Sequence, residues 1–506
     1  MKKLSKRVYV EGRRFDHLPE KIIQFGEGNF LRGFVDWMVQ QMNMQDLFMG
    51  RIVAIQPTPH GKVVPKLNAQ DGLYTVVLRG IENGAEVDHV ETISSISRGI
   101  NPYTNWEEVL KLAESKDIQF VFSNTTEAGL SYVKEEYEPE KSPLSFPGKL
   151  TAFLFHRFQV MGDIPNTGLK IFPCELLENN GDLLKQIVLQ ISADWNLPTG
   201  FINWVTEHNR FCNTLVDRIV TGFPKDNLEE FMKRLGYEDE LLTVGEPFHL
   251  FAIEADEETA LSIPFHLAGL NVKWGDVKPF RELKVRILNG AHTMMFAAAY
   301  LSGANTVLEA MQDKILREYI INGIYQEILP VLPMEIEQKK DFANSVVERF
   351  RNPFTHHQLL DLGLNAVFKY RVRVLPTLID SAESGHLPSA ICFSLAALIA
   401  FYRGEHVKGN LMIGYRGEEE YSVREQTETL QFFRDAWAGY QGREDDVKLL
   451  VETVLANECL WGCNLTEIEE LTEIVSAYLH HIIQEEMKPA LVQLLRTANY
   501  NRGDGS

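Results

Sequence analysis

Hydrophobic and polar positions follow different patterns in the two halves of the chain. In the first half, short apolar runs alternate with segments of helical periodicity, and glycine-containing turns separate them. The apolar runs predict strands at residues 21–25, 51–55, 118–122 and 169–173, and a helix is predicted over residues 29–42. This alternation is typical of a mostly parallel sheet with helices on both faces, so we predict an α/β fold for this part.

Two local patterns add detail to this prediction. Residues 74–79 and 85–94 are predicted to form a pair of antiparallel strands, because Glu82, Asn83 and Gly84 provide a hairpin turn between them. Thr104 is followed three residues later by Glu107, which predicts a capping box that opens a helix reaching about residue 115.

From about Val277 onward the pattern is helical. Residues 283–301, 307–332, 358–379, 388–402, 447–457 and 465–487 show helical periodicity with few strand signals. A chain of 506 residues is longer than one hydrophobic core usually supports. We therefore predict two domains, residues 1–276 with the parallel sheet and an all-helical domain over residues 277–506.

Composition narrows the choice of partners. The formal net charge of −20 argues against nucleic acid and anionic membrane surfaces. No apolar run reaches membrane-spanning length, the basic N-terminus lacks the apolar core of a secretory signal, and the five mostly scattered cysteines fit a reducing compartment. We expect a cytoplasmic protein, monomeric or a small homo-oligomer, in which local cations or backbone N–H groups hold any anionic ligand.

A glycine turn between the first strand and the first helix indicates a dinucleotide site. Gly26 would make the tight turn, and Gly28 would let the backbone approach a pyrophosphate at the start of the helix. The third glycine position holds Leu31, so a simple strand–helix turn is the alternative. The candidate residues for binding the cofactor here are Phe25, Gly26, Glu27, Gly28, Asn29 and Phe30.

The residue expected to contact the cofactor's ribose lies at the end of the second strand. Gln56 stands there in place of a carboxylate, and its amide can hydrogen-bond ribose hydroxyls without repelling a 2′-phosphate. No arginine adjoins it, which favours NAD over NADP.

Residues 284–292 combine a cation, a carboxamide and an imidazole in an apolar helical pattern. At about 100° per residue, Lys284 and His292 lie about 80° apart and Asn289 lies about 140° from Lys284, so all three can border one cleft. Desolvation among apolar neighbours would lower the pKa of Lys284 and make it a general base, while Asn289 could donate to an alkoxide and His292 could hold a hydroxyl. The alternative is an amphipathic helix with Lys284 extended along its surface and Asn289 as a cap.

Several ordered motifs along nearly the whole chain resemble those of the mannitol dehydrogenase family of long-chain polyol dehydrogenases. They are residues 26–32, 71–75 and 123–127, Cys174-Glu175 with Asn180-Gly181, residues 216–219, the Lys284, Asn289 and His292 set, and residues 349–353. The residues of the first and last motifs are similar to those of the branch of this family that acts on the keto-uronate tagaturonate. Glu175 and Leu176 replace the Asp-Asn pair of mannitol and mannonate enzymes.

The resemblance implies an N-terminal Rossmann-type domain, a helical C-terminal domain, and an active site between them that uses NAD and no metal. The implied reaction interconverts D-tagaturonate and D-altronate by hydride transfer. Lys284 would be the general acid/base, Asn289 and Asn180 would donate to the oxyanion, and His292 would orient the substrate.

The same resemblance implies a supporting group of residues. Thr125 and Glu127 would lie on the cofactor side, with Glu127 either moving a proton to solvent or remaining a solvated loop carboxylate. Asp217 and Arg218 would support the substrate, although Asp217 could equally be an ion-pair partner near a helix end.

A uronate substrate carries a carboxylate, which an acidic protein must hold with local cations. Arginine and histidine are concentrated over residues 349–373, and Arg351 with His357 are the expected carboxylate-binding residues, because the Arg-Phe-Arg-Asn-Pro turn interrupts the helical pattern. Lys369, Arg371 and Arg373 fit either this role or a solvated helix face.

Three other functions are compatible with these sequence features. A mannonate (fructuronate) or mannitol dehydrogenase would differ only in the shape of the substrate pocket. A sugar-acid epimerase would retain its NAD and regenerate it in each turnover. A nucleotide-sensing protein without catalysis is also compatible with such a fold, but the presence of Lys284, Asn289, His292 and Asn180 argues against it.

Overall fold

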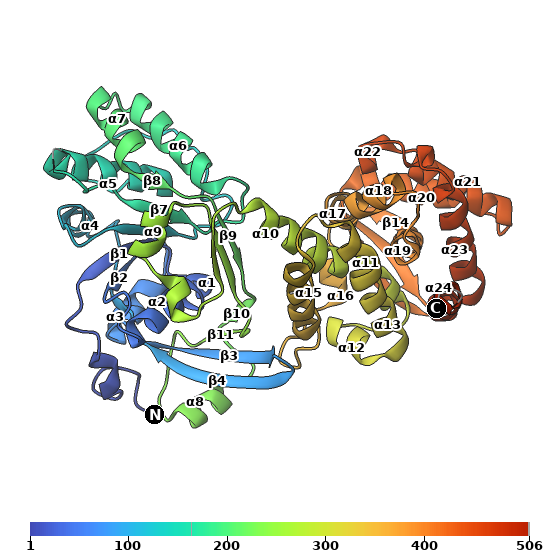
Figure 1. The fold of residues 1–506 in the computed structure, drawn as a ribbon, viewed down its shortest axis with the longest axis horizontal. Helices are drawn as coiled ribbons and strands as arrows, with labels where there is room; N and C mark the ends of the chain where they lie inside the picture. The colour runs from blue at the N-terminus through green and yellow to red at the C-terminus, as the bar shows by residue number, and fades with distance from the viewer. Residues whose placement is uncertain (163, 504–506) are drawn as a thin grey trace. The chain divides into compact units, whose positions relative to one another are not determined.

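The computed structural model describes residues 1–162 and 164–503 and divides into two compact units. The first unit comprises Met1–Arg79 and Glu86–Phe280, and the second comprises Gly80–Ala85 together with the chain from Arg281 onward (Figure 1). In the described part of the chain, no helix is both long enough and apolar enough to cross a membrane.

A six-stranded sheet forms the centre of the first unit. Its order is β5-β2-β1-β6-β7-β8, and every neighbouring pair is parallel. The strands are β1 (Glu20–Phe25), β2 (Arg51–Ile55), β5 (Ile96–Ile100), β6 (Phe120–Ser123), β7 (Lys170–Pro173) and β8 (Arg210–Phe211). The predicted mostly parallel sheet is confirmed, and the four predicted strands correspond to β1, β2, β6 and β7.

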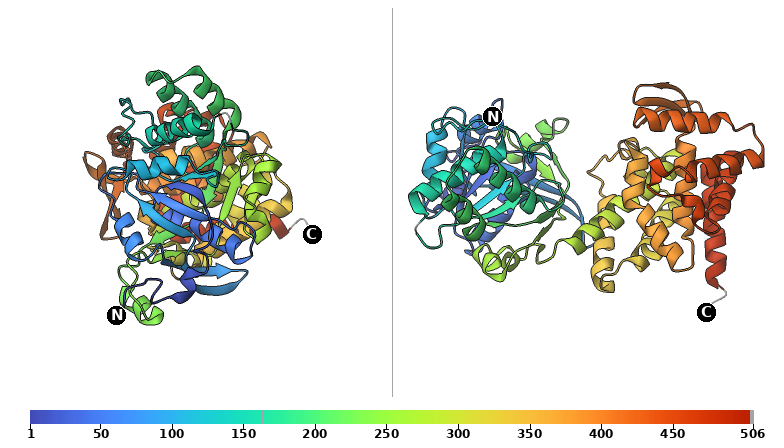
Figure 2. Two further views of the ribbon diagram at one scale, coloured as in Figure 1. Left: turned by 90° about the vertical axis from the view of Figure 1, so that its left-hand side faces the viewer. Right: turned by 90° about the horizontal axis from the view of Figure 1, so that it is seen from above.

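Helices cover both faces of this sheet because successive side chains of each strand point to opposite sides. Ile23, Phe25 and Val53 pack in a core with the helices on one face, which are α4 (Trp106–Ala113), α5 (Phe146–Met161), α6 (Asn180–Asp194) and α7 (Thr199–His208). Ile22 and Ile52 belong to the core of the other face, with α1 (Asn29–Arg32), α2 (Val35–Met44) and α3 (Val63–Ala69). Figures 1 and 2 show this layering.

Two smaller sheets complete the first unit. One has the order β10-β11-β3-β4, from β3 (Tyr74–Glu82), β4 (Ala85–Ile93), β10 (Val220–Gly222) and β11 (Thr243–Gly245). The other has the order β13-β12-β9, from β9 (Thr214–Asp217), β12 (Leu250–Ile253) and β13 (Val272–Trp274). The short helix α8 (Leu228–Leu235) connects β10 to β11, and α9 (Glu257–Ser262) with the 3₁₀ turn η2 (Phe265–Ala268) connects β12 to β13. A further 3₁₀ turn, η1 (Val10–Arg13), precedes β1.

The predicted hairpin is present as β3 and β4. Its two turn residues, Asn83 and Gly84, have φ angles of +53° and +76°, the left-handed conformation that a two-residue hairpin turn requires. The tip of the hairpin belongs to the second unit, where the N–H groups of Asn83 and Gly84 donate to the Glu348 carboxylate at 3.2 and 2.6 Å.

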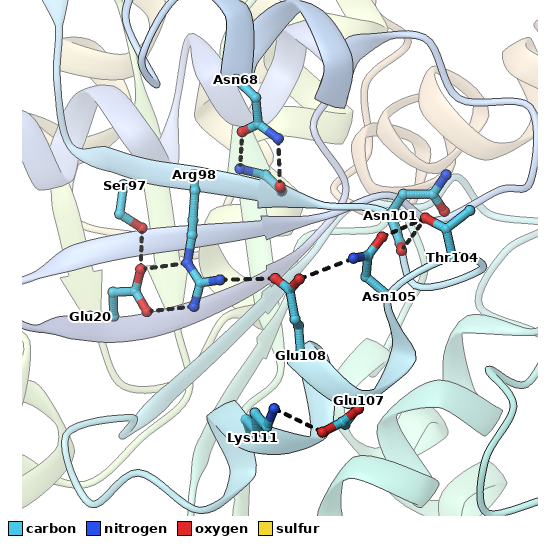
Figure 3. A network of polar contacts seen from close by, with 11 residues as sticks. Glu20, Asn68, Ser97, Arg98, Asn101, Thr104, Asn105, Glu107, Glu108 and Lys111 are labelled. Atoms are coloured by element: carbon cyan, nitrogen blue, oxygen red, sulfur yellow. Dashed lines mark hydrogen bonds and ion pairs between the residues drawn. The ribbon is translucent and has the colours of Figure 1, made fainter.

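The start of α4 differs from the prediction (Figure 3). The helix begins at Trp106, and Thr104 does not cap it, because the Thr104 hydroxyl donates to the Asn101 carbonyl and to Asn105 Oδ1. Glu107 pairs with Lys111 one turn later, at 2.8 Å, instead of bonding back to the chain before the helix. The predicted capping box is wrong, since local side-chain bonds in the turn compete with the cap.

Helices dominate the second unit, which confirms the helical prediction. They are α11 (Gly290–Leu301), α12 (Val307–Gln312), α13 (Lys314–Asn322), α14 (Leu329–Val331), α15 (Ile336–Phe350), α16 (Leu359–Leu362), α17 (Ala366–Arg373), α18 (Leu375–Glu383), α19 (Ser389–Phe401), α20 (Thr427–Ala438), α21 (Glu444–Leu455), α22 (Glu458–Trp461), α23 (Leu471–Glu485) and α24 (Met487–Gly503), with a 3₁₀ turn η5 (Leu465–Glu467). The almost wholly buried α19 packs against α11 and α23 at the centre.

The second unit also has elements that the sequence patterns did not indicate. A three-stranded antiparallel sheet follows α19, formed by β14 (Gly404–Lys408), β15 (Leu411–Arg416) and β16 (Glu419–Arg424). Two helical segments have the wider π geometry, η3 (Lys284–Asn289) and η4 (Gly323–Ile328). The segment η3 continues α10 (Lys278–Leu283), in which the division between the units falls.

Arg157 anchors α5 to the chain before β6. We predict that replacing Arg157 lowers the free energy of unfolding considerably. Its guanidinium donates to the carbonyls of Thr167, Ala113, Ser115 and Ile118 at 2.7–2.9 Å, and the side chain is 1% exposed. Arg157→Met would leave these buried acceptors without donors, at a cost of about 3 kcal/mol or more in the free energy of unfolding. Urea unfolding of the variant checks this, with exposed Arg434→Met as the control; equal midpoints in the two variants would contradict it.

Candidate functional site

The predicted dinucleotide turn follows β1 in the first unit. Gly26 has φ +122°, and a Cβ at this position would lie 2.9 Å from the Asn124 carbonyl oxygen, so only glycine fits. A Cβ at Gly28 would meet no atom within 4 Å, which leaves open space beside the backbone. Because the carboxyl ends of β1 and β6 meet here, the turn lies where parallel α/β sheets bind their ligands.

The helix after this turn is interrupted, in contrast to the continuous helix predicted over residues 29–42. The short helix α1 ends at Arg32, and α2 begins at Val35 after Gly33 and Phe34. A Cβ at Gly33 would lie 3.2 Å from Val220, so close packing against β10 replaces helical continuity at this point.

Arg32 lies beneath the glycine turn and bonds to it. The side chain is 3% exposed and donates to the Glu27 carbonyl, to Asn29 Oδ1 at 2.6 Å and to Thr243 Oγ1 at 3.3 Å. Its charge is buried, which lowers its pKa from the ordinary value. Arg32 therefore links the turn to β11 of the neighbouring sheet.

Glu27 is an unusual residue for a turn that would receive a pyrophosphate. It stands between the two glycines, is 6% exposed, and burial raises its pKa to about 7. The neighbouring Phe30 stacks on Phe34 with ring centroids 4.9 Å apart, and Phe25 is fully buried in the sheet.

Gln56 follows β2 directly, as predicted, but the loop after it, which contains Gly61, covers its side chain. It is 1% exposed, its amide donates to the Thr58 carbonyl at 2.8 Å, and its Oε1 has no hydrogen-bond partner. A Cβ at Gly61 would lie 2.5 Å from Gln56 Cδ, so the loop closes over the side chain. Contact with a ribose would require this loop to open.

Glu175 connects the ends of β6 and β7. Its buried carboxylate accepts from the Ser123 hydroxyl at 3.0 Å and from the backbone N–H and hydroxyl of Thr125 at 2.9 and 3.1 Å. Burial raises its pKa. Thr125 is thereby fixed in a half-buried position, whereas Glu127, two residues later, is exposed to solvent.

Asn180 begins α6 and lies buried between β7 and β9. Its Nδ2 is within 2.9–3.3 Å of the carbonyls of Pro173, Glu175 and Thr214 and of the Thr214 hydroxyl, and its Oδ1 accepts from the Thr214 N–H at 2.8 Å. These contacts make Asn180 a structural clamp. The predicted oxyanion role would require its amide hydrogens to leave these acceptors.

Arg218 also bonds to main-chain groups. Its guanidinium donates to the carbonyls of Glu246 and Gly33 at 2.8 Å and of Pro247 at 3.3 Å, and it lies 4.3 Å from the Trp37 ring centroid. Asp217, the last residue of β9, is likewise buried, with 5% of its surface exposed. The structure thus gives Arg218 a supporting position within the first unit.

The Lys284 segment of the second unit is a π-helix instead of the predicted α-helix. Because its hydrogen bonds span five residues, a residue and the fifth one after it lie about one turn apart. Lys284 and Asn289, which α-geometry would separate by about 140°, therefore approach the same face. Both are half-buried, and His292 follows three residues after Asn289 at the start of α11.

His292 is surrounded by cationic groups. It is 7% exposed, its ring lies 4.4 Å from that of Phe350 and 4.9 Å from that of His357. Burial first, and then the charges of His357, Arg349, Arg373 and Lys369, hold its pKa well below the ordinary value. His292 is therefore a neutral imidazole at physiological pH.

The basic side chains around His292 come from α15, α17 and the loop between them. We call Arg349, His357, Lys369 and Arg373 the basic cluster. Burial also lowers the pKa of His357, Lys369 and Arg373. The segment η3 packs against both α15 and α17, and a Cβ at Gly290 would lie 3.1 Å from the Arg373 carbonyl, so glycine permits this close approach.

The structure divides the predicted carboxylate pair. His357 belongs to the basic cluster, but Arg351 is exposed at the C-terminal end of α15, and Arg349 takes the buried position. The spacing of Phe342, Val346 and Arg349 on one helical face could have revealed this, since Arg351 lies off that face. In α17, Lys369 and Arg373 are half-buried, whereas Arg371 is exposed to solvent.

The chain is similar to known proteins over most of its length. The profile for the mannitol dehydrogenase Rossmann domain matches residues 20–264, and that for the mannitol dehydrogenase C-terminal domain matches residues 276–483. The altronate oxidoreductase of Halalkalibacterium halodurans is 51% identical over 96% of this chain and 95% of its own length. That of Bacillus subtilis is 42% identical over 97% and 98%, respectively.

Two solved structures share the fold. A D-sorbitol dehydrogenase in substrate-free form matches with a TM-score of 0.74 and 22% identity, covering 94% of this chain and 96% of that protein. The Pseudomonas fluorescens mannitol 2-dehydrogenase, in a ternary complex with NAD and D-mannitol, matches with a TM-score of 0.67 and 20% identity over 98% and 99% of the two chains.

We predict from its surroundings that the His292 imidazole does not titrate near neutral pH. Because burial and neighbouring cations lower its pKa, the neutral imidazole persists as the pH falls from 8 to 6. Nitrogen-15 NMR of the histidine side chains checks this, with His292→Gln identifying the resonance. A midpoint for His292 between pH 6 and 8 would contradict the prediction.

Proposed function

The chain belongs to the mannitol dehydrogenase family, and on that premise we propose that it is an NAD-dependent oxidoreductase that interconverts D-altronate and D-tagaturonate. The relatives that are 41–51% identical over nearly the whole chain are named altronate oxidoreductases, which supports this substrate pair. The observation that carries the proposal is the basic cluster around His292 in a protein whose formal net charge is −20.

The residues at the carboxyl edge of the parallel sheet fit a dinucleotide. The open space at Gly28 and the tight turn at Gly26 give a pyrophosphate access to backbone N–H groups. Bound NADH would supply the hydride, and the protein would supply position and charge. We propose NAD in preference to NADP because no arginine adjoins Gln56 in the sequence to bind a 2′-phosphate.

Reduction of an internal ketone generates negative charge on its oxygen, which the protein must stabilise and then protonate. We propose that Asn289 donates its amide to this oxygen and that Lys284 delivers the proton, since the π-helix turns both side chains toward one face. Neutral His292 can accept from or donate to a neighbouring hydroxyl and so orient the sugar chain.

The substrate's carboxylate would bind to the basic cluster. Four cationic or protonatable groups gather there; the charge of the exposed Asp361 acts on His357 and Lys369, and that of the buried Glu425 acts on Lys369. Arg349 is the preferred partner, because a buried guanidinium can make two parallel hydrogen bonds to a carboxylate. This assigns to Arg349 the function that the sequence suggested for Arg351.

The proposed function is tested by stoichiometric turnover with pure substrates. NADH and NADPH are each offered with tagaturonate, fructuronate and fructose, and oxidation of the cofactor is followed by its absorbance. We expect the highest kcat/KM for NADH with tagaturonate. Preference for fructuronate or fructose would assign another member of the family, and conversion of a sugar acid without net NADH consumption would indicate an epimerase.

Lys284 is the residue whose removal should stop chemistry without preventing cofactor binding. Lys284→Ala should lower kcat by about 10²–10⁴-fold, the range for loss of a general acid, and leave the Kd for NADH within about twofold. Exposed Lys278→Ala is the control and should keep full activity. Undiminished turnover in Lys284→Ala would remove this residue from the mechanism.

Arg349 and Arg351 form a matched pair on one helix for testing the carboxylate site. Arg349→Ala should raise KM for tagaturonate by about 10–100-fold, as expected for a lost charged hydrogen bond, and change KM for the uncharged fructose little. Arg351→Ala should change neither value, because its side chain is exposed. Equal losses on both substrates, or a larger effect in Arg351→Ala, would overturn the assignment.

A further inference from the structure

We propose that the Glu27 side chain is an internal anion that competes with the cofactor's pyrophosphate for the glycine turn, so that NADH binding takes up a proton at Glu27. The inference rests on the proposed function, because it requires the turn between Gly26 and Gly28 to be the pyrophosphate site. It goes beyond that function by making affinity for the cofactor depend on the charge of one side chain.

The position of Glu27 makes it a competitor. It lies between the two glycines, and only 6% of its surface is exposed. Its carboxyl group belongs to the turn whose backbone N–H groups would receive a phosphate. A buried carboxylate beside these N–H groups competes with a phosphate oxygen for them.

The residues around Glu27 do not neutralise its carboxylate with a hydrogen-bonded cation. Arg32 is the nearest cation, but its guanidinium donates to the Glu27 carbonyl, to Asn29 and to Thr243. The charge of Arg32 acts on Glu27 only at longer range and is outweighed by burial.

Other titratable groups beneath the turn add negative charge. Asp36 of α2 is fully buried with a pKa raised to about 7, and its Oδ1 has no hydrogen-bond partner. Asp239 also faces Arg32, as does Tyr74, whose pKa is raised well above its ordinary value so that it stays protonated. One buried guanidinium therefore faces three acids, Glu27, Asp36 and Asp239, and a pyrophosphate would add further negative charge.

The physical consequence is coupling between cofactor binding and protonation. A pyrophosphate beside the turn repels the Glu27 carboxylate, and protonation removes both the repulsion and the competition for the N–H. Because the pKa of Glu27 is raised to about 7 in the free protein, this proton is available at neutral pH. NADH should bind most tightly below pH 7 and progressively less tightly as the pH rises above it.

The test compares the whole protein with Glu27→Gln, which keeps the size of the side chain and removes its charge. NADH is titrated at pH 6 and pH 8 by its fluorescence. The wild-type Kd should rise by up to about tenfold between these values, and that of the variant by less than about twofold. At pH 8 the variant should therefore bind NADH more tightly than the wild type.

Calorimetry measures the proton directly. NADH is titrated near pH 7.5 in two buffers of different ionisation enthalpy, and the difference in heat gives the number of protons taken up. We expect net proton uptake in the wild type and no uptake in Glu27→Gln. Asp36→Asn should still take up the proton; this variant tests the other buried acid whose pKa is raised to about 7. If Asp36→Asn does not fold, the Glu27→Gln result decides alone.

The possible failures are distinguishable. NADH binding without proton uptake, or uptake that persists unchanged in Glu27→Gln, would overturn this inference and leave the proposed function intact. Absence of NADH binding at every pH would overturn both.

Discussion

Buried polar side chains that bond to main-chain groups hold the loops of the first unit in place. Arg32 supports the glycine turn from below, Glu175 joins the ends of β6 and β7, and Asn180 clamps β7 to β9. Each side chain provides donors or acceptors for loop groups that regular secondary structure leaves unpaired, and an unpaired buried group would cost about 1–3 kcal/mol. These bonds hold the chain in position where β1, β6 and β7 end.

Electrostatics sets a second constraint, because a strongly acidic chain is proposed to bind an anionic cofactor and an anionic substrate. The two units meet this constraint differently. The first offers backbone N–H groups at the glycine turn, with the buried Arg32 behind them. The second concentrates Arg349, Lys369 and Arg373 around His292, where partial burial strengthens each charge interaction.

The π-helix η3 is the local distortion on which the proposed chemistry depends. A regular α-helix would turn Asn289 well away from Lys284, whereas the wider turn brings them to a common face, one turn before His292. Such segments are less stable than α-helix and are frequent at functional sites. Gly290 lets α17 approach immediately after it and so brings the basic cluster close to His292.

The sequence by itself determined the alternation of strands and helices, the glycine turn, the helical second part and the family, because these depend on periodicity and on short motifs. Contacts between distant residues decided the rest. The burial of Gln56 under its loop and the hydrogen bonds of Asn180 and Arg218 to backbone carbonyls follow from packing that no local pattern encodes. A residue's type limits the chemistry it can perform, but its neighbours in space decide whether it is solvated, paired or charged, and only the tertiary structure brings those neighbours together.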